Sequence, residues 1–300
     1  IYMLSIYFNT ENSTKFSEKQ KIKPKSKKET NPLFNFKTPK EKFYDFIPKF
    51  YTVNLDSIKE NNYVLNYAKD DIEIDKKIGN TKQVKNDCWL LAGINALANN
   101  HKGQEYIKKA IIYNNTDNIV IHFKGTKTNV TVPKIALNAA KQSKNYVKGD
   151  DDMLAIEIAT EYYKKMLITN NEALKNKDAN IINGKHSSGN LNDPIAGGFS
   201  SDIMFLITGK KSKTYFNSKN GCTNQIKNLI NQIKENPDKY AITCNFKEKR
   251  NGLYIHHAYT LKKVDDNFVT LINPHNSENE ENIPIYDFYE NINSLTLLEL

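Results

Sequence analysis

The chain of 300 residues contains no run of about 18 consecutive apolar residues, the length that a helix needs to cross a bilayer. We therefore expect no transmembrane segment. The apolar opening, residues 1–8, has neither an initiating Met nor the basic residues with which a secretory signal begins. The sequence therefore does not decide export, and a cytoplasmic and a secreted location both stay open.

Cysteine is scarce, with only Cys88, Cys222 and Cys244 in the chain. An odd number of cysteines without the short spacings of metal ligands argues against a disulfide framework and against a zinc site. We expect Cys222 and Cys244 to be unpaired, buried thiols, and a disulfide between them is the alternative.

The excess of positive charge is concentrated near the start of the chain. The formal charge is +9, and residues 1–60 carry 12 Lys against 7 Asp or Glu, which accounts for +5. Residues 15–29 are mostly Lys, Ser and other polar residues, a composition that buries too little apolar surface to become ordered. Because few aromatic residues lie between these lysines, we expect a solvated arm and no nucleic-acid partner.

Residues 31–67 are instead rich in Phe and Tyr and are interrupted by prolines. Such a segment can dock on a folded body without forming one of its own. We therefore assign residues 1–70 to an N-terminal extension, a flexible basic arm followed by an aromatic docking segment. We expect this extension to act as an autoinhibitory or regulatory segment.

Hydrophobic spacing predicts mainly helices first and mainly strands afterwards. The expected helices are residues 88–100, 101–113, 152–167, a short one that begins at Ser200 or Ser201 and ends at Gly209, and 224–235. The expected strands are 118–123, 129–132, 240–246, 255–264 and 268–272, with hairpin turns at 124–127 and 265–267. The predicted fold class is α+β, with a helical lobe at 71–198 and a β-rich lobe at 199–300.

The most informative stretch is Asp87-Cys88-Trp89, which is followed by an apolar helical run. A helix N-terminus, with its unpaired N–H groups and partial positive charge, lowers the pKa of a thiol placed there. Asn86 or Asp87 is suited to cap that first turn. We therefore expect Cys88 to be an activated nucleophile at the exposed tip of a buried helix.

A cysteine nucleophile requires a base within hydrogen-bond reach and a third group that orients the base. His257 opens an expected strand, whose alternation can present the imidazole to a cleft. Asn273 follows the strand paired with it, 16 residues later. The order Cys88, His257, Asn273 therefore predicts a catalytic triad at the junction of the two lobes.

Three motifs resemble the protease core of the calpains, which are papain-like cysteine endopeptidases. They are QVKNDCWLLA from Gln83 to Ala92, HHAYT from His256 to Thr260, and NPHN from Asn273 to Asn276. The similarity extends over roughly residues 75–300. It implies a two-lobed papain-like fold and the hydrolysis of peptide bonds in a protein or peptide substrate through a thioester acyl-enzyme.

The resemblance also implies a role for each matching residue. Cys88 would be the nucleophile, His257 the base and then the acid, and Asn273 the group that orients the imidazole. Gln83 would donate its side-chain amide to the oxyanion together with the backbone N–H of Cys88. Trp89 is expected to pack behind the helix.

Three positions line the expected substrate groove, and some motif positions depart from the family. Gly197 and Gly198 are similar to the family's glycine beside the substrate strand. His256 is the third residue expected to contact substrate, and it stands where the family typically has Gly. Gln83 lies five residues before Cys88, where the family usually has six. His275 replaces the Trp that usually shields the Asn and His pair.

We predict no cofactor and no metal ligand, with calcium as the alternative because animal calpains depend on it. The acidic stretches 150–152 and 278–281 could supply oxygen ligands, but neither has the twelve-residue pattern of an EF-hand. The three histidines His256, His257 and His275 suggest a metal only weakly, since the triad already accounts for one of them.

Two other functions use the same residues. An acyl transferase of the transglutaminase type shares the nucleophile and base, but that class generally has Asp as the third member, where this chain has Asn273. A catalytically inactive papain-fold binding module is suggested by the altered spacing of Gln83 and by His256 and His275.

Overall fold

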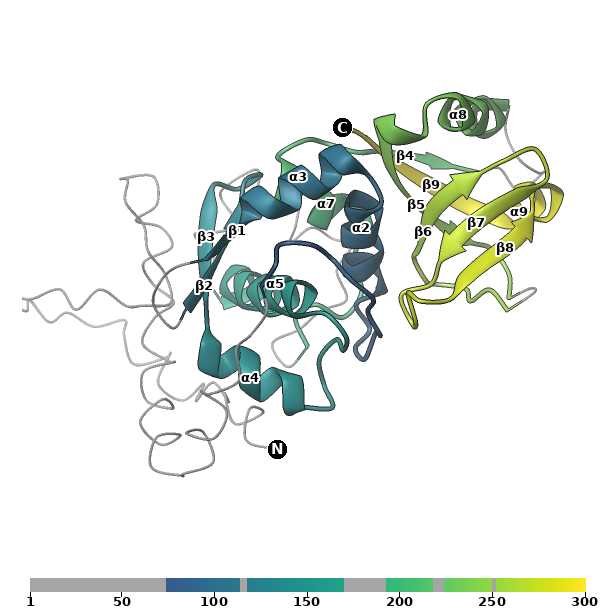
Figure 1. Ribbon diagram of the computed structural model, residues 1–300. Coiled ribbons are helices and arrows are strands. Elements are labelled where there is room, and N and C mark those ends of the chain that lie inside the picture. The colour runs from purple at the N-terminus through teal and green to yellow at the C-terminus, as the bar shows by residue number, and fades with distance from the viewer. Residues whose placement is uncertain (1–73, 114–117, 170–192, 218–223, 250–251) are drawn as a thin grey trace, which may run out of the picture.

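The computed structural model describes residues 74–113, 118–169, 193–217, 224–249 and 252–300 (Figure 1). The predicted N-terminal extension, residues 1–70, lies outside the described residues, as does Cys222. The described chain mixes helices with two antiparallel sheets, so the α+β class is confirmed.

The first part of the structure packs helices against a small antiparallel sheet in the order β1-β2-β3. Along β2, Ile119, Ile121 and Phe123 are buried in alternation with partly exposed residues. The elements of this part are α2 (Cys88–Ala98), α3 (His101–Ala110), β1 (Ile111–Tyr113), β2 (Asn118–Phe123), β3 (Thr128–Pro133), α4 (Lys134–Gln142), α5 (Asp151–Thr169) and α7 (Ser200–Thr208).

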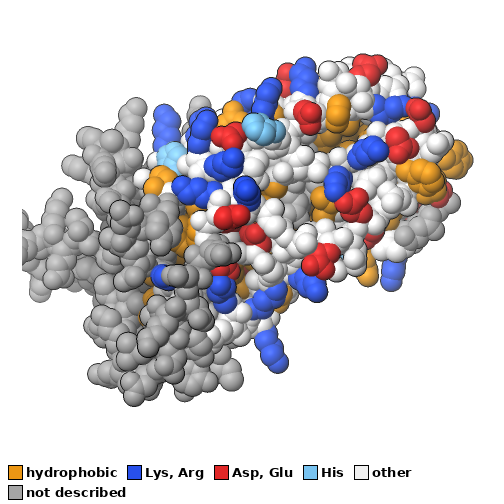
Figure 2. Space-filling view, viewed as in Figure 1, with side chains coloured by type: hydrophobic (Ala, Val, Ile, Leu, Met, Phe, Trp, Pro, Cys, Tyr) orange, Lys and Arg blue, Asp and Glu red, His pale blue; other side chains and the backbone are white. Residues whose placement is uncertain are grey.

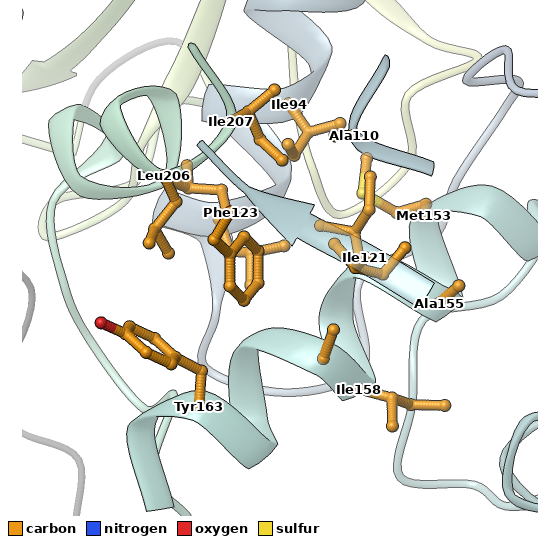
Figure 3. Packing of buried hydrophobic residues seen from close by; sticks show 14 of the residues in the cluster. Ile94, Ala110, Ile121, Phe123, Met153, Ala155, Ile158, Tyr163, Leu206 and Ile207 are labelled. Atoms are coloured by element: carbon orange, nitrogen blue, oxygen red, sulfur yellow. The ribbon is translucent and has the colours of Figure 1, made fainter. Parts of the chain in front are cut away.

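One hydrophobic core joins these helices to the sheet. Figure 3 shows Phe123 of β2 beside Leu206 of α7, and the Phe123 ring centroid lies 5.4 Å from that of Tyr163 on α5. Helix α2 also packs closely on α7, because a Cβ added to Gly93 would lie 2.3 Å from Ile203 Cγ2. Helix α7 thus shares the core of α2. Its residues follow position 198, so the predicted boundary between the lobes assigns them to the β-rich lobe and not to the core in which they pack.

The second part is a six-stranded antiparallel sheet in the order β4-β9-β5-β6-β7-β8. Helix α8 packs on this sheet through Ile226, Ile230 and Ile233, which repeat at helical spacing and are buried. The elements of this part are β4 (Lys213–Phe216), α8 (Asn224–Glu235), the 3₁₀ turn η5 (Pro237–Lys239), β5 (Tyr240–Phe246), β6 (Tyr259–Val264), β7 (Phe268–Ile272), β8 (Glu280–Pro284), α9 (Ile285–Asn291) and β9 (Ile292–Glu299).

Most predicted elements are confirmed, and two of the predicted boundaries are wrong. The expected helix 101–113 ends at Ala110, because residues 111–113 pair with β2 as strand β1. The expected strand 255–264 begins only at Tyr259. The backbone of His256 has φ 55°, in the left-handed region, and cannot continue a strand.

Helix α2 lies against the second sheet, alongside β6 (Figure 1). The Thr260 hydroxyl donates to the Ala92 carbonyl at 2.7 Å, and the Asn99 amide donates to the Lys262 carbonyl at 3.1 Å. The helix therefore runs beside the strand in the same direction. Cys88 lies four helical residues before Ala92, a rise of about 6 Å, and Ala258 lies two residues before Thr260, about 6.6 Å in an extended chain. The start of α2 is therefore expected to lie level with residue 258.

The surface and the helices give two further findings. On the face shown in Figure 2, basic and acidic side chains are interspersed over the described residues, without a broad field of one sign.

Within the described ranges, every helix is too short or too polar to pass through a lipid bilayer.

Candidate active site

Cys88 is the first residue of α2 and is only partly buried. The three residues that follow it in the helix are fully buried, with Trp89 1% exposed and Leu90 and Leu91 0% exposed. The backbone N–H groups of Ala258, Trp89 and Cys88 itself point at the sulfur and lower the pKa of the thiol. Because Ala258 follows His257 directly, the thiol lies beside the segment that carries the predicted base.

Burial outweighs these hydrogen bonds, so the pKa of Cys88 is raised above its ordinary 9.0. The negative charge of the neighbouring Asp87 raises it further. Our expectation of a thiol whose pKa is lowered by the helix N-terminus is therefore wrong for this structure. Removal of the thiolate's hydration is the larger effect here.

His257 and Asn273 are in contact, as the sequence predicted. The distance from His257 Nε2 to Asn273 Oδ1 is 2.9 Å, and the two residues are 6% and 7% exposed. His257 lies in the turn before β6, not within a strand as expected. Burial lowers the pKa of His257 to about 4, the hydrogen bond to Asn273 raises it, and the charge of His275 lowers it. At neutral pH both shifts favour a neutral imidazole and a neutral thiol in the free protein.

Three rings surround the His257 imidazole, and that of Tyr259 meets it edge-on at a centroid distance of 4.8 Å. The His275 ring centroid lies 4.2 Å from that of His257, with the ring planes 36° apart. Tyr254 meets the His257 ring edge-on at 5.9 Å and the His275 ring at 5.1 Å. His275, which the resemblance sets in place of a Trp, thus packs on the imidazole of His257, with Tyr254 beside it.

A buried pair of carboxyl groups lies behind the start of α2. Asp87 is 1% exposed and Glu157 of α5 is 0% exposed, and neither Asp87 oxygen has a hydrogen-bond partner unless one of the two carboxyl groups carries a proton. Glu157 also accepts the Val147 N–H at 2.8 Å. Burial raises the pKa of Asp87 to about 6, and burial together with the charge of Asp87 raises the pKa of Glu157 well above its usual range. At neutral pH the pair therefore holds one proton, and Glu157 is the group that carries it.

This pair explains why the predicted helix cap is not observed. Asp87 occupies the N-cap position of α2, and its carbonyl accepts the Leu90 N–H at 2.8 Å. Its side chain makes no capping hydrogen bond, because the carboxyl group turns inward to Glu157. Lys85 moderates the negative charge, since it lowers the pKa of Asp87 while its ammonium group lies 2.6 Å from Glu161 Oε2.

Gln83 lies in the loop before α2 and is tied to the loop that carries Asn273. Its backbone N–H donates to the Pro274 carbonyl at 2.9 Å. Its side-chain amide folds back and donates to the Lys85 carbonyl at 2.6 Å. The predicted oxyanion role of Gln83 therefore stays a prediction, because in this arrangement one amide N–H is already used within its own loop.

Gly197 and Gly198 lie beside the loop that leads into α2. Gly197 has φ 65°, which favours glycine, and its N–H donates to the Asn86 carbonyl at 2.8 Å. A Cβ on Gly198 would lie 2.7 Å from the Trp89 ring. Trp89 packs behind the helix as expected and donates its indole N–H to the Ile195 carbonyl at 2.8 Å. Gly198 is thus required by Trp89, and a role in substrate binding stays a prediction for both glycines.

His256 is exposed, whereas the adjacent His257 is buried. Together with Phe246, Lys247 and Asn293 it lines a small surface cavity of about 270 Å³. The left-handed backbone at His256 explains why a glycine suits this position.

The acidic stretches that we weighed for calcium are bonded within the protein. Asp150 accepts the N–H groups of Met153 and Gly79 at 2.7 and 2.6 Å, and Asp151 pairs with Lys141 at 2.6 Å. In the second stretch, Glu280 pairs with Lys262. In the part of the chain that the structure describes, no three His, Cys, Asp or Glu side chains are grouped as a metal site requires.

The partners of Asn273 and Asp87 were not predicted from the sequence. Glu281 accepts the Asn273 Nδ2 at 2.7 Å, although we had considered it only as a calcium ligand. A predicted β7–β8 register would have brought it close, because Leu271 pairs with Glu281. The partner of Asp87 could not be found in this way, since Glu157 lies 70 residues away on another helix.

Cys244 is buried and free, so the alternative of a disulfide to Cys222 is not formed. Burial raises the pKa of Cys244 far above its ordinary 9.0, as is typical of an inert core thiol. Cys88 is therefore the more accessible of the two thiols in the described part of the chain.

In comparisons with known proteins, no family model matches the sequence and no curated protein matches it significantly.

Proposed function

We propose that this protein is a cysteine endopeptidase with a calpain-like, papain-type core, in which Cys88, His257 and Asn273 form the catalytic triad. The observation that carries the proposal is the meeting of three distant segments. The sulfur at the start of α2 faces the Ala258 N–H, and the adjacent His257 imidazole is bonded to Asn273.

The raised pKa of Cys88 and the lowered pKa of His257 define the first step. The imidazole accepts the thiol proton as the sulfur attacks the peptide carbonyl, so the thiolate forms only as it reacts. The resulting imidazolium is stabilised by Asn273, whose hydrogen bond raises the pKa of His257. His257 then gives the proton to the leaving amine, and a thioester remains on Cys88.

Water completes the cycle. His257 removes a proton from the water molecule as its oxygen attacks the thioester, and the carboxylic acid leaves as Cys88 regains its proton. In both steps the negative charge develops on the carbonyl oxygen. The N–H groups at the start of α2 are directed toward the reacting sulfur, and we assign the oxyanion to the Cys88 N–H together with Gln83.

The test is hydrolysis of casein by the purified chain and by its Cys88→Ala and His257→Ala variants. The proposal predicts cleavage by the wild type and loss of cleavage in both variants, each with an unchanged far-UV circular dichroism spectrum. Cleavage that survives in Cys88→Ala would overturn it. An amine-incorporation assay on the same samples separates hydrolysis from acyl transfer, because a transglutaminase-type enzyme would incorporate amine faster than it hydrolyses.

The raised pKa of Cys88 and the lowered pKa of His257 favour the inactive binding module, since a protein without turnover has no need of an activated pair. That alternative predicts no cleavage by the wild type and partner binding that Cys88→Ser leaves unchanged. Trimming of residues 1–70 during incubation of the wild type, and not of Cys88→Ala, would exclude it and would locate a processing region in the N-terminal extension.

A further inference from the structure

Asn273 makes three hydrogen bonds through the two atoms of its carboxamide. Its Oδ1 faces His257 Nε2 at 2.9 Å and accepts the backbone N–H of His275 at 3.1 Å. Its Nδ2 donates to Glu281 Oε1 on β8 at 2.7 Å. The side chain is therefore held on both sides.

These partners allow only one orientation of the carboxamide. A backbone N–H can only donate, so the atom that faces the His275 N–H must be the oxygen. A carboxylate can only accept, so the atom that faces Glu281 must be the NH₂ group. Two independent partners thus direct the Asn273 oxygen toward His257.

The orientation of Asn273 in turn fixes the tautomer of the imidazole. An oxygen at 2.9 Å can only accept, so His257 Nε2 carries the hydrogen. In a neutral ring the other nitrogen, Nδ1, then has a free lone pair. That nitrogen is the one able to accept the proton of a thiol.

We propose that Glu281 is a positioning residue, which holds the Asn273 carboxamide with its oxygen toward His257 and so keeps His257 in the tautomer that can accept the Cys88 proton. This inference rests on the proposed function of the site. Without Glu281, only the His275 N–H would still hold the oxygen in place, and a rotated carboxamide would present its NH₂ group to Nε2. His257 would then carry its hydrogen on Nδ1 and could not act as the base.

The kinetic test compares Glu281→Ala and Glu281→Gln with the wild type. We expect Glu281→Ala to lower kcat about tenfold, which is ~1.4 kcal/mol, with KM unchanged. Glu281→Gln retains an acceptor oxygen of the same reach, so we expect it to restore most of that loss. Glu280→Gln is the matched control, because it removes the neighbouring charge, which pairs with Lys262 and not with the triad.

A double-mutant cycle shows whether Glu281 acts through Asn273. In an Asn273→Ala background, Glu281→Ala is expected to change kcat by less than about twofold, because the carboxamide that it orients is gone. Glu281→Ala that keeps the wild-type kcat, or that costs as much in the Asn273→Ala background, would overturn the proposal.

The tautomer can be measured without any activity. The ¹⁵N shifts of the His257 ring, assigned by comparison with His257→Gln, should show hydrogen on Nε2 in the wild type and a mixture of tautomers in Glu281→Ala. Equal shifts in the two proteins would refute the positioning role even in an active enzyme. Absence of Cys88-dependent hydrolysis in the wild type would instead refute the proposed function, and the ¹⁵N shifts would still decide the role of Glu281.

Discussion

The buried carboxyl pair behind the nucleophile gives a prediction about stability and pH. Asp87 is 1% exposed, and its pKa rises from the ordinary 3.8 to about 6 in the folded protein. A folded-state pKa above the unfolded value means that the folded state binds the proton more tightly. The associated stability is present below pH 4 and is lost as the pH rises through 6.

The size of this effect follows from the pKa change. One pKa unit corresponds to 1.36 kcal/mol, so the shift of Asp87 alone is worth about 3 kcal/mol of stability, most of which is lost between pH 4 and pH 7. Asp87→Asn cannot ionise and does not suffer this loss. It also removes the charge that raises the pKa of Glu157, which acts in the same direction. We expect the unfolding free energy of Asp87→Asn, relative to the parent, to rise by about 3 kcal/mol from pH 4 to pH 8.

Urea unfolding at a series of pH values measures this difference directly. Trp89 is the single tryptophan of the chain and is buried, so its fluorescence reports the loss of the core around α2. A Cys88→Ala background removes both autolysis and titration of the thiol. The exposed Asp238→Asn is the matched control and should show no such gain. A difference between Asp87→Asn and its parent that stays flat from pH 4 to pH 8 would refute the buried pair.

Three other substitutions have defined outcomes. Gly198→Ala should destabilise the protein by about 1–3 kcal/mol in urea unfolding and shift the Trp89 emission, because its Cβ would lie 2.7 Å from the indole. Leu91→Ala should cost about 2–5 kcal/mol in the same assay, because Leu91 is fully buried in the core, whereas the exposed Val84→Ala should cost little. Asn273→Ala should lower kcat about 10- to 100-fold with little change in KM, because the imidazolium loses the partner that raises the pKa of His257. Asn273→Gln serves as the comparison. If it loses as much kcat and as much thermal stability as Asn273→Ala, Asn273 would instead have a purely structural role.

Local patterns were enough to predict most helices and several strands. Helix α8 was predicted with both of its ends, since its Ile residues repeat at helical spacing and Pro237 follows it. Strand β1 was missed because Ile111 is in a strand only through its pairing with Ile121. We assigned no element to β9, although it lies between β4 and β5 in the sheet, because its role depends on strands distant in the sequence.

The site shows the same division between local and distant information. The residue types and their order predicted that His257 and Asn273 would meet, and they do. The pKa of Cys88 could not be predicted from its place at a helix start, because the burial that raises it comes from packing around the site. The contact of Glu281 with Asn273 depends on how β8 is registered on β7.

Labelling by an epoxide inhibitor of papain-like enzymes tests the central claim most directly. The wild type, His257→Ala and Asn273→Ala are each incubated with the epoxide, and the modified cysteine is mapped by mass spectrometry. The account predicts modification of Cys88 alone in the wild type, strong slowing in Asn273→Ala and none in His257→Ala. Modification of Cys222 or Cys244 with Cys88 unmodified, or an equal rate of Cys88 labelling in all three proteins, would contradict a thiol that His257 and Asn273 activate.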